Sequence, residues 1–338
     1  MTTASWHPAF GAQMEDGGVR FSVWAPNAET VDLELLENNL SRTVQMTGDA
    51  DGRFETLVPD IGAGARYLYR LDGGDGRPDP YSRFQPEGVH GPSEVVDPHR
   101  FTWTDSEWRG ITPEGIVVYE LHIGTMTPGG TFLSLIDELA ELKSLGVTAI
   151  ELMPVAQCPG RWNWGYDGVD LFAPSNAYGT PDEFRQLVDA AHGVGLGVIL
   201  DVVYNHLGPE GNYLGVYANE YFSTVHETGW GAGLNWDGEK CEFVRQFAID
   251  NACYWITEFH IDGLRLDATH AIVDDCPIHL VQELTAKARD VAGDREIFVV
   301  AEDGRHEITR ARAIDEGGEG LDAIWADDFH HDVRVHLT

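Results

Sequence analysis

The sequence has little basic charge, and lysine is especially scarce. Its 338 residues include 56 acidic and 22 basic side chains, so the formal net charge is −34, and only three of the basic residues are lysines. A nucleic acid needs a basic patch to bind, so this composition argues against nucleic acid as a partner and disfavours phosphorylated or carboxylated substrates. A neutral substrate fits best. A salt-adapted surface and a plain compositional bias both remain open as explanations of the acidic excess.

Several other features are absent. The four cysteines form no Cys-x-x-Cys pair, which argues against a zinc site or a disulfide framework, and we expect reduced thiols. No Gly-x-Gly-x-x-Gly follows the first strand of the later α/β region, so no dinucleotide cofactor is expected. No apolar run reaches 18 residues and no signal peptide begins the chain. We therefore expect a cytoplasmic protein that contacts no membrane and needs no metal or other cofactor.

Residues 1–98 are predicted to form a small β-sandwich followed by an irregular connector. Apolar residues alternate along 19–23 and again along 31–35, which is the period of a half-buried strand, and two further strands are expected within 52–72. The Pro- and Gly-rich segment 77–98 is too interrupted for regular structure, and we expect it to pack as a connector.

Residues 99–338 are predicted to form an incomplete (β/α)₈ barrel. Short apolar strands within 116–121, 148–154, 197–203, 263–267, 297–301 and 322–326 alternate with helices expected at 131–145, 181–192, 244–259 and 275–292. Strands that are apolar on both faces and separated by helices indicate a parallel sheet buried under helices. An open doubly wound sheet fits the same pattern, but the missing dinucleotide motif favours the barrel. Only six strands can be counted.

Polar and aromatic side chains gather at the carboxyl ends of these strands. They are His122, Trp164, Tyr166, Asp201, Asn205, His206, Arg265, Asp267 and Glu302. In a barrel these ends converge on one face, where the active site is built. The sequence therefore predicts a site on that face.

Asp267 and Glu302 form the most informative pair. Each ends an apolar strand, where an unpaired carboxylate is costly. Arg265 lies two residues before Asp267 and so on the same side of the strand, which favours an ionised Asp267, whereas apolar residues precede Glu302 and favour its protonated form. One carboxylate beside one carboxylic acid is the arrangement used to hydrolyse glycosides. A buried Arg–Asp pair with a helix-capping Glu is the structural alternative, and spacing alone does not exclude a metal site.

Two further segments have less specific patterns. We interpret 204–238 as a long loop without secondary structure, whose aromatic residues (Tyr213, Tyr217, Tyr221, Phe222, Trp230 and Trp236) either stack on sugar rings or form a small apolar core. Near the end of the chain, His330, His331 and His336 stand among Asp327, Asp328 and Asp332. A solvated helix at the rim of the substrate site is favoured there over metal ligation.

Three segments resemble signature regions of the α-amylase family, glycoside hydrolase family 13. They are DVVYNH (201–206), GLRLDATHAI (263–272) and VVAED (299–303), in the order and spacing of that family. Further segments, including PGRWNWGYDGV and WADDFHHDV, resemble the members that release trehalose from maltooligosyltrehalose. The resemblance extends over essentially the whole chain and implies that residues 1–98 correspond to a carbohydrate-binding-like accessory domain.

The resemblance also implies roles for individual residues. Asp267 would be the nucleophile and Glu302 the general acid/base, with Arg265 supporting the nucleophile. His206 and Asp201 would line the subsite of the attacked sugar, Tyr166 would stack on that ring with Trp164 also binding substrate, and His270 would lie on the leaving-group side. The implied reaction is retaining cleavage of the α-1,4 bond next to a terminal trehalose.

One departure from the family pattern concerns its fourth region, which contains an Asp that stabilises the transition state. No such motif follows the sixth strand in these 338 residues. We therefore expect a portion of a longer enzyme, with little hydrolase activity on its own. A 1,4-α-glucan branching enzyme and a non-catalytic α-glucan-binding fragment are the alternatives.

Overall fold

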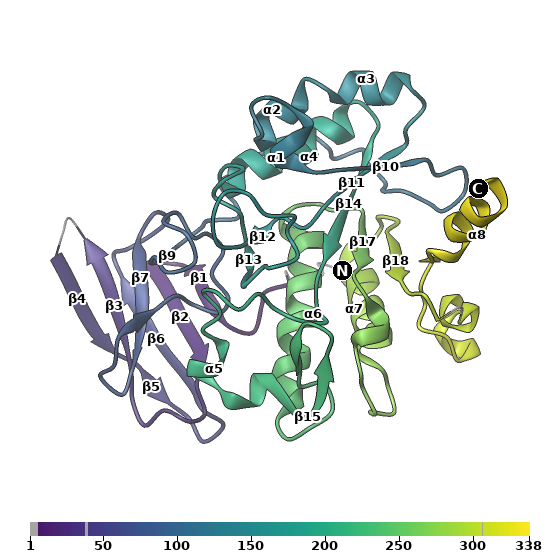
Figure 1. Ribbon diagram of the computed structural model, residues 1–338. Helices are drawn as coiled ribbons and strands as arrows, with labels where there is room; N and C mark the ends of the chain where they lie inside the picture. Colours follow the sequence, from purple (N-terminus) through teal and green to yellow (C-terminus); the bar gives the residue numbers. More distant parts are fainter. Residues whose placement is uncertain (1–5, 38–39, 306) are drawn as a thin grey trace.

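The computed structural model describes residues 6–37, 40–305 and 307–338, and it begins with two antiparallel sheets (Figure 1). One sheet has the order β1 (Gly11–Glu15), β2 (Gly18–Trp24), β6 (Arg53–Pro59), β5 (Thr47–Gly48). The other has the order β4 (Leu40–Gln45), β3 (Val31–Glu37), β7 (Arg66–Leu71), β8 (Gly76–Arg77), with β9 (Ser93–Glu94) also paired to β7. Val31, Leu33 and Leu35 on β3 are all buried, which confirms the alternation read from the sequence.

A curved sheet of six parallel strands forms the second part of the fold (Figure 1). Its order is β10 (Val118–Leu121), β11 (Ala149–Leu152), β14 (Gly197–Val202), β17 (Gly263–Leu266), β18 (Phe298–Glu302), β19 (Ala323–Trp325). The strands are neighbours in the sheet in their order along the chain, as in a (β/α)₈ barrel and unlike a doubly wound sheet. Among the described residues β10 and β19 do not pair with each other, so the sheet stays open, as the six countable strands predicted.

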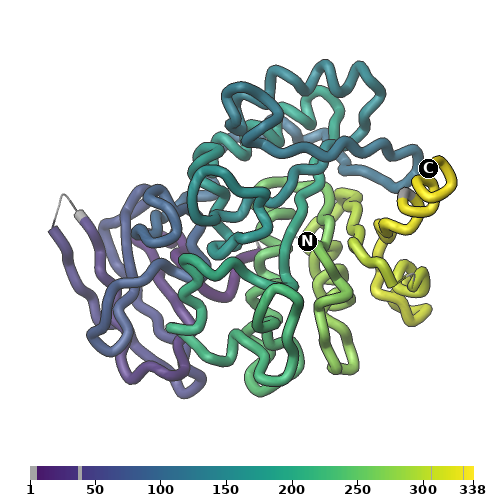
Figure 2. Tube along the Cα trace, viewed as in Figure 1, coloured from purple at the N-terminus to yellow at the C-terminus, as the bar shows by residue number. Residues whose placement is uncertain are grey.

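Helices follow the strands, as the chain path shows (Figure 2). They are α1 (Ile123–Met126), α2 (Phe132–Ile136), α3 (Leu139–Ser144), α4 (Pro181–Gly193), α5 (Leu214–Tyr217), α6 (Cys241–Glu258), α7 (Leu280–Ala292) and α8 (Asp328–Leu337). The helix predicted at 181–192 is α4, and Thr180 caps it in a reciprocal capping box with Glu183.

Three predicted helices differ by more than one residue from their expected limits, and one of them, α6, begins at Cys241 instead of residue 244. The helix predicted at 131–145 is divided into α2 and α3 at Asp137 and Glu138, although both residues keep right-handed helical angles. The helix predicted from 275 begins only at Leu280. Pro277 disfavours helical angles in the residue before it, and the His279 ring caps the first turn by accepting the Val281 amide at 3.2 Å.

The prediction that 204–238 lacks secondary structure is wrong. The segment contains α5, a 3₁₀ turn (Asn219–Tyr221) and an antiparallel hairpin of β15 (Phe222–Thr228) and β16 (Gly231–Leu234). A second, unpredicted pair joins β12 (Ala156–Gln157) to β13 (Asp170–Pro174). Each pair joins two strands that are close together in the sequence.

Aromatic stacking joins the two parts of the molecule. Trp24 of β2 stacks on Phe243 of α6 with ring centroids 4.5 Å apart, and Tyr81 stacks on Phe172 of β13 at the same distance. Arg83 is buried in the connector and donates to Glu258 of α6 at 2.9 Å. The connector is therefore ordered and packed, as predicted. No helix of the described residues is both long and apolar enough to cross a bilayer.

Candidate active site

A pocket opens at the carboxyl ends of β14, β17 and β18. Its lining consists of Tyr166, Asp167, His206, Trp230, Arg265, Asp267, Ala268, His270 and Glu302. These residues come from five separate stretches of sequence, and they meet because parallel strands end on the same edge of the sheet. Asp267 and Glu302 therefore belong to a single site.

Arg265 stands at the centre of the carboxylates. Its Nη1 donates to Asp267 Oδ1 at 2.5 Å and to both oxygens of Asp201 at 3.0 Å. Its Nη2 lies 3.9 Å from Glu302 Oε2. The sequence predicted the contact with Asp267 from the i, i+2 spacing, but the proximity to Glu302 arises because β17 and β18 are neighbours. One guanidinium thus faces three carboxylates.

Asp201 lies behind this pocket. It is buried, and its Oδ2 accepts the Tyr166 hydroxyl at 2.8 Å in addition to the bonds from Arg265. Burial raises the pKa of Asp201 to about 7 against the opposing attraction of Arg265. Burial, followed by the nearby Asp201, raises the pKa of Tyr166. Asp201 therefore orients Arg265 and Tyr166, and it is not among the residues that line the pocket.

A strained turn directly after Asp267 places a backbone amide against Glu302. Ala268, directly after Asp267, has left-handed angles of φ 40° and ψ 51°, which cost about 1–3 kcal/mol in a residue with a Cβ. This conformation lets the Ala268 amide donate to Glu302 Oε2 at 2.8 Å. Asn205 Nδ2 donates to Asp267 Oδ2, also at 2.8 Å. Each carboxylate is therefore oriented by a fixed donor in addition to Arg265.

His206 and Trp230 form one wall. The two rings stack with centroids 5.2 Å apart at an interplanar angle of 19°, and His206 is further bonded to Asn205 and to the Tyr166 carbonyl. Trp230 lies in the turn of the β15–β16 hairpin and is 56% exposed. By contrast Tyr217, Tyr221 and Trp236 of the same segment are buried. The segment is thus partly an apolar core and partly a wall of the site.

Trp164 is the predicted substrate-binding residue that lies away from the carboxylates. It is 75% exposed and lines a separate hollow with His122, Met153 and Trp162. His270 is exposed at the edge of the main pocket. Asp167, Ala268 and Trp230 also line the main pocket, and sequence reasoning gave the first two no role because nothing local marks them.

The C-terminal histidines lie on α8. Of the groups whose side chains the structure describes, His226, Asp237 and Asp275 come close enough to one another to hold a cation, and none of them belongs to α8. His226 Nε2 and Asp237 Oδ2 lie 3.1 Å apart, within hydrogen-bond distance. All four cysteines are free, and two of them are buried.

Comparisons with known proteins agree with this architecture. Residues 9–87 match the family described as carbohydrate-binding module 48 (isoamylase N-terminal domain), and residues 95–221 match the α-amylase catalytic domain. The malto-oligosyltrehalose trehalohydrolase of Saccharolobus solfataricus is 46% identical over 97% of this chain, which covers 57% of that protein. A 1,4-α-glucan branching enzyme of Corynebacterium jeikeium is 32% identical over 97% of the chain and 50% of its own length.

A solved structure has the same fold as this chain. A candidate α-amylase from Salmonella typhimurium superposes with a TM-score of 0.91 at 43% identity, over 98% of this chain and 56% of that one. The chain spans about half the length of the curated relatives that it matches. Two family matches in order, a common fold and the carboxylates of the pocket make the chain similar to the α-amylase family of glycoside hydrolases.

Proposed function

We propose that this chain contains the catalytic pair of a retaining glycoside hydrolase. Its substrate would be a maltooligosyltrehalose, in which it cleaves the α-1,4 bond next to the terminal trehalose and releases trehalose. The observation that carries the proposal is the placement of Asp267 and Glu302 on neighbouring parallel strands, in one pocket and around one arginine. The relatives named as trehalohydrolases support the choice of substrate.

The proposed mechanism has two steps. Asp267 Oδ attacks the anomeric carbon while Glu302 donates a proton to the departing glycosidic oxygen, and a covalent glycosyl ester forms on Asp267. Glu302, now ionised, then removes a proton from water, which attacks the same carbon and frees Asp267. Arg265 donates to Asp267 Oδ1 and holds the carboxylate in position for the attack. Two inversions give net retention.

The neighbouring side chains would bind the sugar. Tyr166, Trp230 and His206 line the pocket, and the Trp230 ring stacks on the His206 ring. Aromatic faces pack on the C–H faces of a sugar ring, which suits an uncharged glucan. The net charge of −34 agrees with a neutral ligand. Trp164 would contact a more distant sugar unit of the glucan. His270 would contact the substrate on the leaving-group side.

Residues 1–98 and 99–338 form the two domains in this proposal. Its support is that β9 still pairs with a sandwich strand, whereas β10 begins the parallel sheet at Val118. The accessory domain would brace α6 through Trp24 and Arg83.

We test the chemistry by trapping the covalent intermediate. The chain is incubated with a 5-fluoro-α-glucosyl fluoride, whose fluoride leaves without acid assistance, and peptides are analysed by mass spectrometry. We expect an adduct on Asp267 that is absent from Asp267→Asn and present in Asp294→Asn, an exposed control. Wild-type protein with no adduct, or an adduct on another carboxylate, would contradict the assignment.

The substrate is tested by product analysis. We expect trehalose from maltotriosyltrehalose at a low rate, because no counterpart of the family's fourth signature region occurs in these 338 residues. New α-1,6 branches in amylose would instead establish the branching enzyme, which the Corynebacterium relative supports. Glucan affinity that survives in Glu302→Gln, with neither product from the wild type, would identify a binding fragment.

A further inference from the structure

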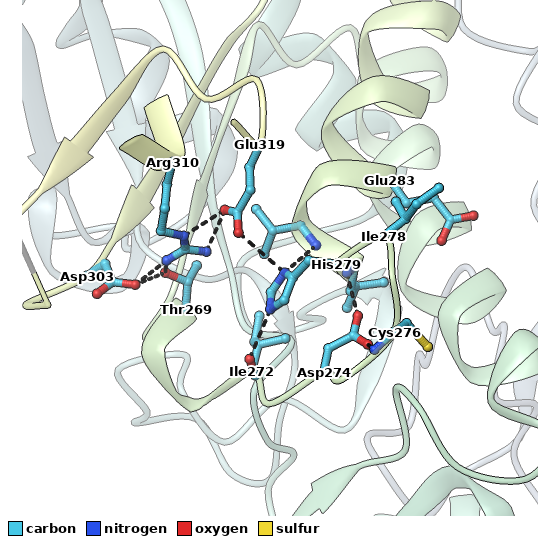
Figure 3. A network of polar contacts seen from close by, with 12 residues as sticks. Thr269, Ile272, Asp274, Cys276, Ile278, His279, Glu283, Asp303, Arg310 and Glu319 are labelled. Carbon is cyan, nitrogen blue, oxygen red and sulfur yellow. Dashed lines mark hydrogen bonds and ion pairs between the residues drawn. The ribbon is translucent and has the colours of Figure 1, made fainter. Parts of the chain in front are cut away.

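Thr269, Asp303 and Arg310 form a buried polar cluster, in which their side chains point toward one another (Figure 3). Thr269 is fully buried, Asp303 is 2% exposed and Arg310 is 6% exposed. Asp303 follows the acid/base in sequence, Thr269 follows the strained Ala268, and Arg310 comes from a 3₁₀ turn (Ile308–Ala311) after β18. Three segments that are separate in sequence thus converge on the back of the site.

The contacts within this cluster are short and complementary. Asp303 Oδ2 accepts from the Thr269 hydroxyl at 2.8 Å and from the Arg310 guanidinium. Arg310 also donates to Thr269 Oγ1 at 2.9 Å and to Glu319 at 2.8 Å. Burial would raise the pKa of Asp303, but hydrogen bonds from Arg305 and Thr269 lower it overall. The cluster therefore contains an ionised carboxylate held by paired charges.

Burying such an ionic cluster has a high desolvation cost. Burying two charges costs more than burying apolar groups of the same volume unless the geometry is well satisfied, so packing alone does not explain it. Its position suggests another reason. The Thr269 hydroxyl, besides its bond to Asp303, lies 3.3 Å from the backbone carbonyl oxygen of Glu302.

We propose that Thr269, Asp303 and Arg310 are positioning residues for the acid/base. They lock the turn after the nucleophile in its left-handed conformation, so that the Ala268 amide stays pointed at Glu302 Oε2. The turn is strained and would relax without a clamp. The proposal rests on the role of Glu302 in the proposed function.

The clamp has a specific consequence for the two chemical steps. An amide N–H donated to a carboxylate stabilises its ionised form and fixes its direction. Glu302 must be ionised and aimed at water only in the second step, when the glycosyl ester is hydrolysed. With a fluoride leaving group the first step needs no proton from Glu302. Loss of the clamp should therefore slow the hydrolysis of the adduct more than its formation.

The test uses Thr269→Val, which keeps the shape and removes the hydroxyl. Thr269→Ser restores the hydroxyl, and Thr285→Val is a matched control, because Thr285 is equally buried and its hydroxyl has no hydrogen-bond partner in the described structure. The first readout is hydrogen exchange of the Ala268 amide, followed by mass spectrometry on overlapping peptides. The second is the rate at which the fluoroglucosyl adduct on Asp267 forms and disappears.

We expect the Ala268 amide to exchange about tenfold faster or more in Thr269→Val, because a turn without its clamp opens more often. Thr269→Ser and Thr285→Val should exchange at the wild-type rate. The adduct should form at a rate within about threefold of the wild type and disappear at least ~10-fold more slowly. Unchanged exchange at Ala268 would overturn the proposal, as would equal slowing of both steps. If the wild type forms no adduct, the proposed function fails, and the exchange measurement alone then decides whether the clamp exists.

Discussion

Glu151 shows at the residue scale how burial alone can change the charge of a side chain. It lies on β11, is fully buried, and neither carboxyl oxygen has a hydrogen-bond partner in the described part of the chain. Burial, followed by the nearby Asp201 and Glu120, raises the pKa of Glu151 to about 9. Its carboxyl group is therefore neutral at pH 7.

This gives a prediction about stability and pH. The folded chain keeps the Glu151 proton up to about pH 9, whereas the unfolded chain releases it near the ordinary value of 4.5. The free energy of unfolding therefore decreases as the pH rises through this window. Glu151→Gln should remove that decrease, with a gain over wild type that grows by about 2 kcal/mol or more from pH 5 to pH 9. Urea unfolding at both pH values measures it.

Glu114→Gln, at an exposed glutamate, is the control and should show no such pH-dependent gain. A gain for Glu151→Gln that is equal at the two pH values would mean that Glu151 is ionised in the folded chain.

The sequence predicted the site residue by residue. Asp267, Arg265 and Glu302 could be predicted because they end apolar strands within recognisable motifs. Thr269, Asp303 and Arg310 could not be interpreted in this way, because their contacts join residues up to 41 positions apart. Arg310 lies in a polar stretch with no strand or helix pattern, and only its place behind β18 gives it a partner.

At the scale of elements, the β15–β16 hairpin decides which aromatic residues face the site. It places Trp230 at its turn over His206, while Phe222 at its base packs against the core. The sequence suggested that these aromatic residues either stack on sugar rings or form an apolar core. It could not assign each residue to one of these roles, because the pairing of the hairpin sets which side chains point outward.

Trp230→Ala tests the wall of the pocket. The proposed glucan site loses one stacking surface, so we expect the affinity for maltotetraose to fall about threefold to tenfold, as removal of an aromatic contact typically does. Thermal unfolding should change little, because Trp230 is 56% exposed. Isothermal calorimetry measures the affinity. Val225→Ala, an exposed position on the same hairpin, controls for damage to the hairpin, and an equal loss in both variants would exclude a direct contact by Trp230.

Element limits were less predictable than element types. Strands and helices alternate in the predicted order, but α7 begins five residues later than expected because Pro277 and the His279 cap set its start. The break between α2 and α3 has no sequence signal of its own, since the apolar spacing continues from Phe132 through Leu139 and Leu142.

At the scale of the whole molecule, the excess of negative charge is the main long-range force. Each of the 22 basic side chains offsets the charge of one of the 56 acidic side chains, which leaves the net charge of −34. Charges of one sign repel across the folded surface and favour expansion. Salt shortens the range of that repulsion from about 10 Å at 0.1 M to about 3 Å at 1 M.

We therefore expect potassium chloride to stabilise the chain. The midpoint of thermal unfolding should rise by about 5 °C or more between 0.05 M and 1 M salt, in line with a gain of about 1–2 kcal/mol. Differential scanning calorimetry measures the midpoint. Sucrose at matched osmolality separates charge screening from preferential exclusion. An unchanged or lower midpoint in salt would contradict net repulsion and would remove the case for a salt-adapted surface.

The sequence by itself determined the order of elements, the parallel sheet, the acidic surface and the two carboxylates, because these depend on local periodicity, composition and short motifs. Only the tertiary structure decided that Arg265 faces Glu302, that Asp201 stands behind the pocket, and that Trp164 lies outside it. Strand periodicity predicts which face of the sheet a side chain lies on, but it does not predict which residue of the adjacent strand that side chain contacts. That neighbour is set by the register between strands and by the path of loops, where contacts form between residues that are far apart in the chain.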